Sequence, residues 1–164
     1  MNIFYLDHNP EIAARLHSDV HVIKMCLETA QILCAVMHRY GLPAPYRASH
    51  TKHPSVIWAG DSKNHYQWLQ ELGLKLCTEY CYRFGKTHAC ENIILNLPLP
   101  PSMPNKEWIA PPQVMPEEYR KQDSIEGYKN YYARAKNYFP GKGEARWTKR
   151  ARPDFMPISP NVPS

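Results

Sequence analysis

The sequence lacks the features that place a protein in or across a membrane. Its 164 residues contain no apolar run of about eighteen residues, and its start does not pass from basic to apolar. We therefore expect neither a transmembrane helix nor a signal peptide, and we expect a cytoplasmic location. No internal repeat is present, which excludes a repeat architecture.

The sequence also lacks a cysteine spacing typical of metal sites. The cysteines are odd in number and lie within apolar helical patterns: Cys26, Cys34, Cys77, Cys81 and Cys90. Cys77 and Cys81 are four residues apart on a predicted helix, which is not a zinc-knuckle spacing. We interpret the cysteines as reduced core thiols, in preference to a metal or redox site, and we expect no cofactor.

What is present is ordinary globular composition, with 43% hydrophobic and 21% charged residues, which argues against wholesale disorder. The length suits one domain with its own core. The net charge of +5 is unevenly distributed, because basic residues gather between Lys142 and Arg152. Such a segment suits a polyanion such as DNA, although a solvated surface segment has the same composition.

Two long helical patterns dominate the chain. Asn9 followed by Pro10 is a helix start, and apolar periodicity then runs from Ile12 to Met37. Ser18 and Asp19 either interrupt this stretch or lie within it. The second helix is predicted from Asp61 or Ser62 to about Phe84, with Gly85 ending it.

Shorter elements complete a mainly α, single-domain helical bundle covering residues 1–164. Residues 42–57 are predicted to be a loop, and Thr87 to cap a helix reaching about Leu95. Residues 97–116 are rich in proline and form a loop that either wraps over the helical body or stays flexible. Asp123 and Glu126 predict a capping box for a last helix to about Tyr138, followed by a basic, irregular tail over 140–164.

A narrow polar line on the first long helix is the strongest functional candidate. At ~100° per residue, its members fall within an arc of about 80° and have mostly apolar neighbours; we call them the polar stripe: His17, His21, Lys24, Glu28 and Gln31. A helix that is apolar over most of its surface is buried on most sides, so ionisable groups along it should face a cleft. The alternative is a solvent face with an ordinary Lys24–Glu28 ion pair.

Three chemistries could use the polar stripe. Lys24 between hydrophobic flanks could act as an amine nucleophile, with Glu28, His21 or His17 moving protons. His17 and His21 could bind a metal with Glu28, but Lys24 would then lie beside the cation, so we expect no metal there. The stripe could also bind phosphate without any reaction.

Basic and aromatic residues elsewhere are candidates for binding phosphate or nucleic acid. They lie at the start of the second long helix, around its end and in the tail: Lys63, His65, Arg83, Lys86, His88, Lys142, Arg146, Trp147, Lys149 and Arg150. Two simpler interpretations stay open, with Asp61 as a helix cap only and Trp147 as an anchor in the core.

The order of these features resembles a known family. A histidine-bearing first helix is followed by HPSVIWAGDSKNHYQWLQELGLKLCTEYCYRFG, then by MPEEYR and a tail with a tryptophan in basic company. This is similar to the phage pyrimidine-dimer DNA glycosylase/AP lyase family, most clearly over SVIWAG and MPEEYR. The chain also resembles a group of uncharacterised phage proteins that open with a comparable NIF-LD…H-D-HV-KM pattern. The resemblance implies a small helical fold and, for a phage protein, the host cytoplasm.

The resemblance also implies a reaction. In that family the amino group of an N-terminal threonine is the nucleophile, a glutamate on the first long helix assists, and arginines hold DNA. Here Met1 precedes Asn2, so that the α-amine is Met1's, and an alignment on His17 puts Lys24 at the glutamate position with Glu28 one turn later. The implied version has Lys24 or the Met1 amine attacking a sugar C1′ of DNA or a nucleotide, with Glu28 as acid/base. The alternatives are a non-catalytic binder of a nucleotide or nucleic acid in a phage accessory role, and a protein that binds a host protein.

Overall fold

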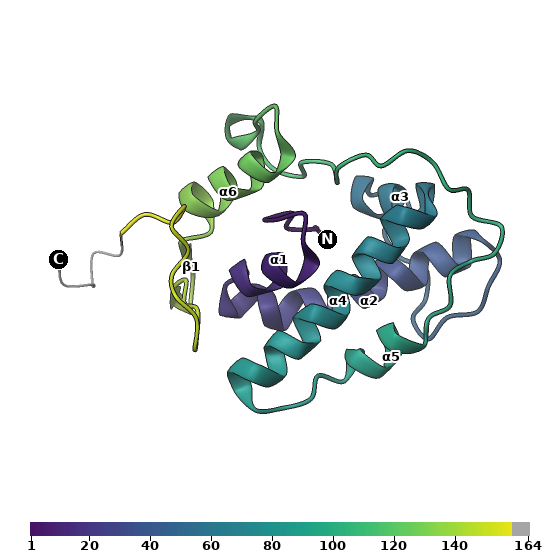
Figure 1. The fold of residues 1–164 in the computed structure, drawn as a ribbon, viewed down its shortest axis with the longest axis horizontal. Helices are drawn as coiled ribbons and strands as arrows, with labels where there is room; N and C mark the ends of the chain where they lie inside the picture. Colours follow the sequence, from purple (N-terminus) through teal and green to yellow (C-terminus); the bar gives the residue numbers. More distant parts are fainter. Residues whose placement is uncertain (159–164) are drawn as a thin grey trace.

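Two long helices, α2 and α4, form the centre of the computed structural model, which describes residues 1–158 (Figure 1). Helix α1 packs on α4, whereas α3 and α5 each pack on both long helices. The described part of the chain is thus mainly helical, as the sequence predicts. The elements are α1 (Pro10–Leu16), α2 (Asp19–Arg39), α3 (Pro54–Asp61), α4 (Lys63–Phe84), α5 (Cys90–Asn96), a 3₁₀ turn η1 (Glu117–Tyr119), α6 (Ser124–Ala135), β1 (Tyr138–Phe139) and β2 (Gly143–Glu144).

The first helical stretch is divided in two. His17 and Ser18 lie between α1 and α2 as their caps, and both have extended backbone, with ψ of 137° and 160°. The division changes the direction of the chain, so that His17 does not continue the face on which Lys24 and Glu28 lie. The start predicted at Asn9 is confirmed, because its side chain accepts hydrogen bonds from the backbone N–H groups of the first turn.

Helices α2 and α4 approach closely at Gly73. A Cβ atom at this position would lie 2.8 Å from Thr29 Cγ2 and 3.1 Å from Ile94 Cδ1, so only glycine fits without displacement of its neighbours. The helix then ends as predicted at Gly85, whose φ of 70° is in the left-handed region.

Two predicted boundaries are wrong. Residues 42–57 do not all form loop, because α3 begins at Pro54, and the side chain of His53 caps it by accepting the Ser55 N–H at 3.1 Å. Proline suits the first helical position, where its missing N–H is not needed. Thr87 does not cap α5, which begins at Cys90 after Ala89.

The proline-rich segment is irregular and wraps over the helices, along the right-hand edge and the top of Figure 1. It is held by specific hydrogen bonds: Trp58 Nε1 donates to the Ile109 carbonyl at 2.8 Å, and the Lys63 N–H donates to the Pro104 carbonyl at 2.8 Å. The capping box beyond it is half confirmed, since the Asp123 carboxylate accepts the Glu126 N–H at 2.9 Å. The helix ends at Ala135, before the predicted Tyr138.

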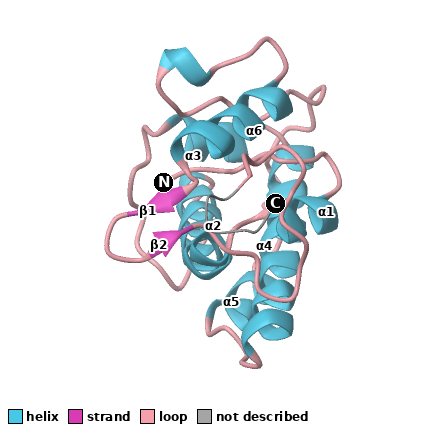
Figure 2. Cartoon of the chain, turned by 90° about the vertical axis from the view of Figure 1, so that its left-hand side faces the viewer, coloured by secondary structure: helices cyan, strands magenta, loops and turns pink. Residues whose placement is uncertain are grey.

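The remaining regular structure is one antiparallel hairpin, the sole sheet within residues 1–158 (Figure 2). Its register pairs Tyr138 with Glu144 and Phe139 with Gly143. One helix of the described chain, α2, is long and apolar enough to cross a membrane by length and composition alone, and 72% of its apolar window is buried against the rest of the protein.

Candidate functional site

An open groove of about 800 Å³ runs beside the solvent-facing side of α2. Its walls come from the amino terminus, α2, the loop before α3, the start of α5 and the hairpin: Met1, Val20, Ile23, Lys24, Leu27, Glu28, Gln31, Tyr46, His50, His88, Ala89, Cys90 and Lys142. The groove therefore collects an α-amine, a carboxylate, two lysines and two histidines. Three members of the polar stripe, Lys24, Glu28 and Gln31, line this groove.

Two of the residues that line the groove, Met1 and Glu28, form an ion pair. The α-amino nitrogen of Met1 lies 3.4 Å from Glu28 Oε1, and the two side chains are only 3% and 12% exposed. Lys24 Nζ lies 3.8 Å from Glu28 Oε2, and its side chain is 65% exposed. Oε2 is buried and has no hydrogen-bond partner among the described residues. A carboxylate thus lies between two primary amines, one sheltered and one in solvent.

The amino terminus is fixed in the groove by its neighbours. Asn2 Nδ2 donates to the Val114 carbonyl at 2.9 Å, and Asn2 Oδ1 accepts from the Tyr128 hydroxyl at 2.8 Å. The next four residues, 3–6, are all buried in the core. The opening segment NIFYLD is therefore anchored in the core and holds the α-amine against Glu28.

Sequence reasoning missed two histidines beside this amine. His50 lines the groove and has a φ of 52°, in the left-handed region that few non-glycine residues adopt. The pKa of His53 is lowered by burial, then by the Met1 ammonium and His50, while Glu28 opposes the shift. The only signal in the sequence is the spacing H-x-x-H before Pro54, within a segment interpreted as loop.

The expectation that His17 and His21 share the cleft is wrong. Both are buried, His17 completely, and His21 stacks on Phe4 with ring centroids 4.1 Å apart. Burial lowers the pKa of His17 to about 4 and that of His21 well below its ordinary value. The interruption at Ser18 and the coverage by Phe4 and Tyr132 explain why these two residues belong to the core.

Several candidates for phosphate binding are used inside the fold instead. Arg83 is buried, and its guanidinium bonds Glu79 at 2.7 Å and Asp19 at 3.0 Å. Arg150 bonds Glu79 at 2.8 Å from the other side. Buried His65 stacks on Trp58 at 4.4 Å, and Trp147 is an anchor in the core, since its Nε1 donates to the Leu16 carbonyl at 2.8 Å.

The remaining basic candidates are dispersed over the surface. Lys142 and His88 line the groove, whereas Lys63, Lys86, Arg146 and Lys149 do not. Lys149 Nζ donates to the Tyr82 carbonyl at 3.1 Å, so that its ammonium holds the tail on α4. Lys86 and Arg146 are exposed, and Lys63 is half-buried at the start of α4.

A second feature not foreseen from the sequence is the meeting of Cys26, Cys77 and His88. Their potential ligand atoms lie within 4.8 Å of one another, next to the groove wall formed by His88. The sequence separations of 51 and 11 residues give no local motif.

Comparison of the chain with known proteins finds no matching family model, no matching curated protein and no matching solved structure. The functional assignment therefore depends on the groove itself.

Proposed function

We propose that the groove is the active site of a DNA- or nucleotide-acting enzyme with N-glycosylase/lyase-like chemistry, on a fold like that of the pyrimidine-dimer DNA glycosylases. The observation that carries the proposal is the 3.4 Å approach of the Met1 α-amine to Glu28 in a partly buried site. An amine beside a carboxylate is what imine chemistry at a sugar carbon needs, since the amine attacks only after losing a proton.

The reaction proceeds through an imine. The neutral Met1 amine attacks C1′ of the sugar while the C1′–N glycosidic bond breaks, and the departing base takes up a proton from water in the open groove. Glu28 accepts the proton that the attacking nitrogen loses and returns it to the sugar ring oxygen, so that the ring opens to a protonated Schiff base. Glu28, again a carboxylate, then takes a C2′ proton while the C3′–O bond breaks and the 3′ phosphate leaves, and water hydrolyses the imine to free the amine.

The rest of the groove suits the same substrate. Lys24 and Lys142 supply positive charge for phosphates, since each lysine acts as a point charge. Ile23 and Leu27 are 47% and 40% exposed in the groove and offer apolar surface to a base.

Reductive trapping tests the proposal. The full chain, with Met1 verified by intact mass, is incubated with duplex DNA carrying either one abasic site or one pyrimidine dimer, in the presence of cyanoborohydride. We expect a covalent protein–DNA adduct, and peptide mapping should place it on the Met1 nitrogen. No adduct on either DNA would overturn the proposal.

Matched variants separate the roles of the groove residues. Glu28→Gln should lower the rate of adduct formation by roughly 10²–10⁴, the usual contribution of a general acid/base. Glu71→Gln, which changes an exposed acid on α4 outside the groove, should leave the rate unchanged. Equal rates for wild type and Glu28→Gln would remove Glu28 from the mechanism.

A non-catalytic binder is the second candidate, favoured by the 65% exposure of Lys24 at the groove. A binder that uses charge alone tolerates Lys24→Arg, whereas a nucleophilic lysine does not, because guanidinium is not nucleophilic at neutral pH. DNA binding without an adduct, retained in Lys24→Arg and weakened in Lys24→Gln, would establish this role.

A further inference from the structure

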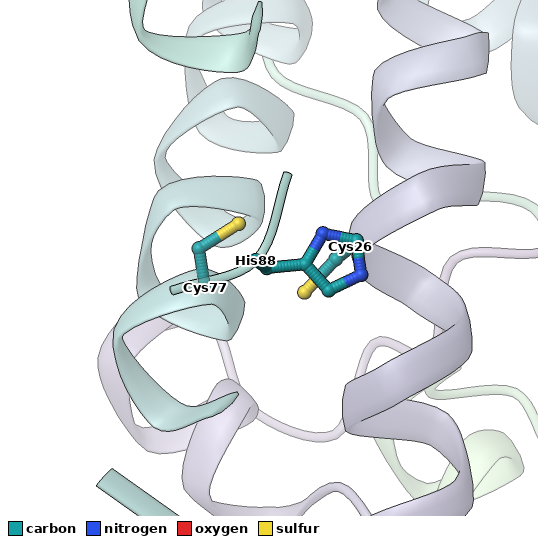
Figure 3. Close-up of side chains that lie close together, drawn as sticks. All are labelled: Cys26, Cys77 and His88. Atoms are coloured by element: carbon teal, nitrogen blue, oxygen red, sulfur yellow. The ribbon is translucent and has the colours of Figure 1, made fainter. Parts of the chain in front are cut away.

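Cys26, Cys77 and His88 converge from three parts of the chain. Cys26 lies on α2, Cys77 on α4, and His88 in the connection from α4 to α5 (Figure 3). The thiols are fully buried, the imidazole is half-buried, and the three potential ligand atoms lie within 4.8 Å of one another. Within the described residues this is the one group of three histidine, cysteine or acidic side chains so close together.

The fold brings them together near a close contact of the two central helices. Gly73 of α4 packs against Thr29 of α2. Cys77 is four residues after Gly73, and Cys26 is three residues before Thr29, so the two thiols face each other one turn along these antiparallel helices. After α4 ends at Gly85, the connection to α5 brings His88 beside the two thiols (Figure 3).

We propose that Cys26, Cys77 and His88 bind one zinc ion. Two thiolates and one neutral imidazole are a ligand set that zinc takes when a fourth position is kept for water or another exogenous ligand. Two thiolates also neutralise the divalent cation, and a neutral complex is the form that a buried site in an apolar core can accept. The inference does not depend on the reaction proposed for the groove.

Hydrogen bonds already hold two of the three potential ligands in place. The Cys26 thiol donates to the Val22 carbonyl at 3.2 Å, and His88 Nδ1 accepts the Cys90 N–H at 3.1 Å. Zinc binds cysteine as thiolate, so binding releases the thiol protons and the affinity falls as the pH is lowered.

The position of His88 connects this site with the groove. His88, Ala89 and Cys90 all line the groove, whereas neither Cys26 nor Cys77 reaches it. The ion therefore lies in the groove wall, with the sulfur ligands on the core side and the histidine on the groove side. The fourth ligand is a water or a small anion that enters from the groove.

Cobalt substitution tests the site on the intact chain. The protein is reduced, stripped with chelator and titrated with Co²⁺, then with Zn²⁺. We expect the sulfur-to-cobalt charge-transfer band and the strong visible bands of a tetrahedral thiolate site, saturating at one ion per chain and abolished by one equivalent of Zn²⁺. Absence of the charge-transfer band would overturn the proposal. If the isolated protein contains a Cys26–Cys77 disulfide and takes up no metal after this disulfide is reduced, the proposal is overturned as well.

Variants identify the ligands. Cys26→Ser and Cys77→Ser should each weaken the charge-transfer band, while Cys81→Ser, an exposed position one turn further along α4, should keep it. Because a buried serine hydroxyl can destabilise the core, His88→Gln on the connecting segment is the decisive variant. It should retain helical circular dichroism and lose at least tenfold in zinc affinity. Unchanged affinity in His88→Gln would exclude the histidine and overturn the proposed ligand set.

Discussion

The hydroxyl of Tyr132 is hydrogen-bonded to Nδ1 of His21, although the two residues are 111 positions apart. This contact joins α6 to α2 across the core, and Phe4 stacks on the same imidazole. His21 is consequently a packing residue with a fixed ring, and it cannot reach the groove that contains Lys24 and Glu28. The polar stripe of the sequence is thus divided between the core and the groove.

The protein should become less stable as the pH is lowered, because it contains two buried histidines. Burial lowers the pKa of His17 from the ordinary 6.5 of a histidine to about 4 in the folded protein, and it also lowers the pKa of His21. Between pH 6.5 and 4 the unfolded chain binds more protons at these histidines than the native state does. The stabilisation present above pH 6.5 is therefore lost as the pH is lowered through this range. For His17 the loss is about 3 kcal/mol. Urea unfolding at a series of pH values measures it; His17→Gln should flatten this dependence, and the exposed His8→Gln should not.

Arg83 should be essential to the fold. Its side chain is fully buried between Glu79 and Asp19, and its guanidinium also donates to the carbonyls of His17 and Arg15. Arg83→Met leaves buried acceptors without a partner and should cost about 3–5 kcal/mol, measured by urea unfolding. The exposed Arg47→Met is the control, expected within about 0.5 kcal/mol of wild type. Similar values for the two variants would contradict a structural role for Arg83.

Gly73→Ala should destabilise the protein, although alanine favours helices by up to ~1 kcal/mol. The added Cβ would lie 2.8 Å from Thr29 Cγ2, and overpacking of this kind costs about 1–3 kcal/mol. Thermal unfolding measures the change. Adding Thr29→Ser removes the obstructing methyl group and should recover part of the loss in the double variant. No recovery would show that the clash lies elsewhere.

Lys142 and Lys149 should differ in their contribution to polyanion binding. Lys142 lines the groove, whereas the Lys149 ammonium is engaged by the Tyr82 carbonyl. If the groove binds DNA, Lys142→Ala should reduce the slope of log affinity against log salt by roughly 0.7–0.9, the value for one phosphate contact. Fluorescence anisotropy with a labelled oligonucleotide provides the measurement. Equal slopes for Lys142→Ala and Lys149→Ala would contradict the assignment.

Local signals predicted the helices well. Asn9 and Gly85 mark real helix ends because their effects act through neighbouring backbone groups, and the same holds for the cap at Asp123. Part of the groove was also predictable, since Lys24 and Glu28 are one turn apart on one helix and must share a face.

The other features depend on long-range packing that no periodicity encodes. His17 follows the helical pattern in sequence, but the extended backbone at Ser18 removes it from the face of Lys24. Arg83 looks like a surface cation until Glu79 and Asp19 are known to enclose it. Likewise, the proximity of Cys26 to Cys77 depends on how α2 packs against α4.

The anchored amino terminus has a practical consequence for recombinant work. Met1 and Asn2 are enclosed by Glu28, Val114 and Tyr128, so a tag fused ahead of Met1 would have to leave through the groove. Such a fusion would replace the charged amine with an amide and fill the groove with foreign peptide. A tag at the carboxyl end leaves the Met1 amine and the groove as they are in this structure.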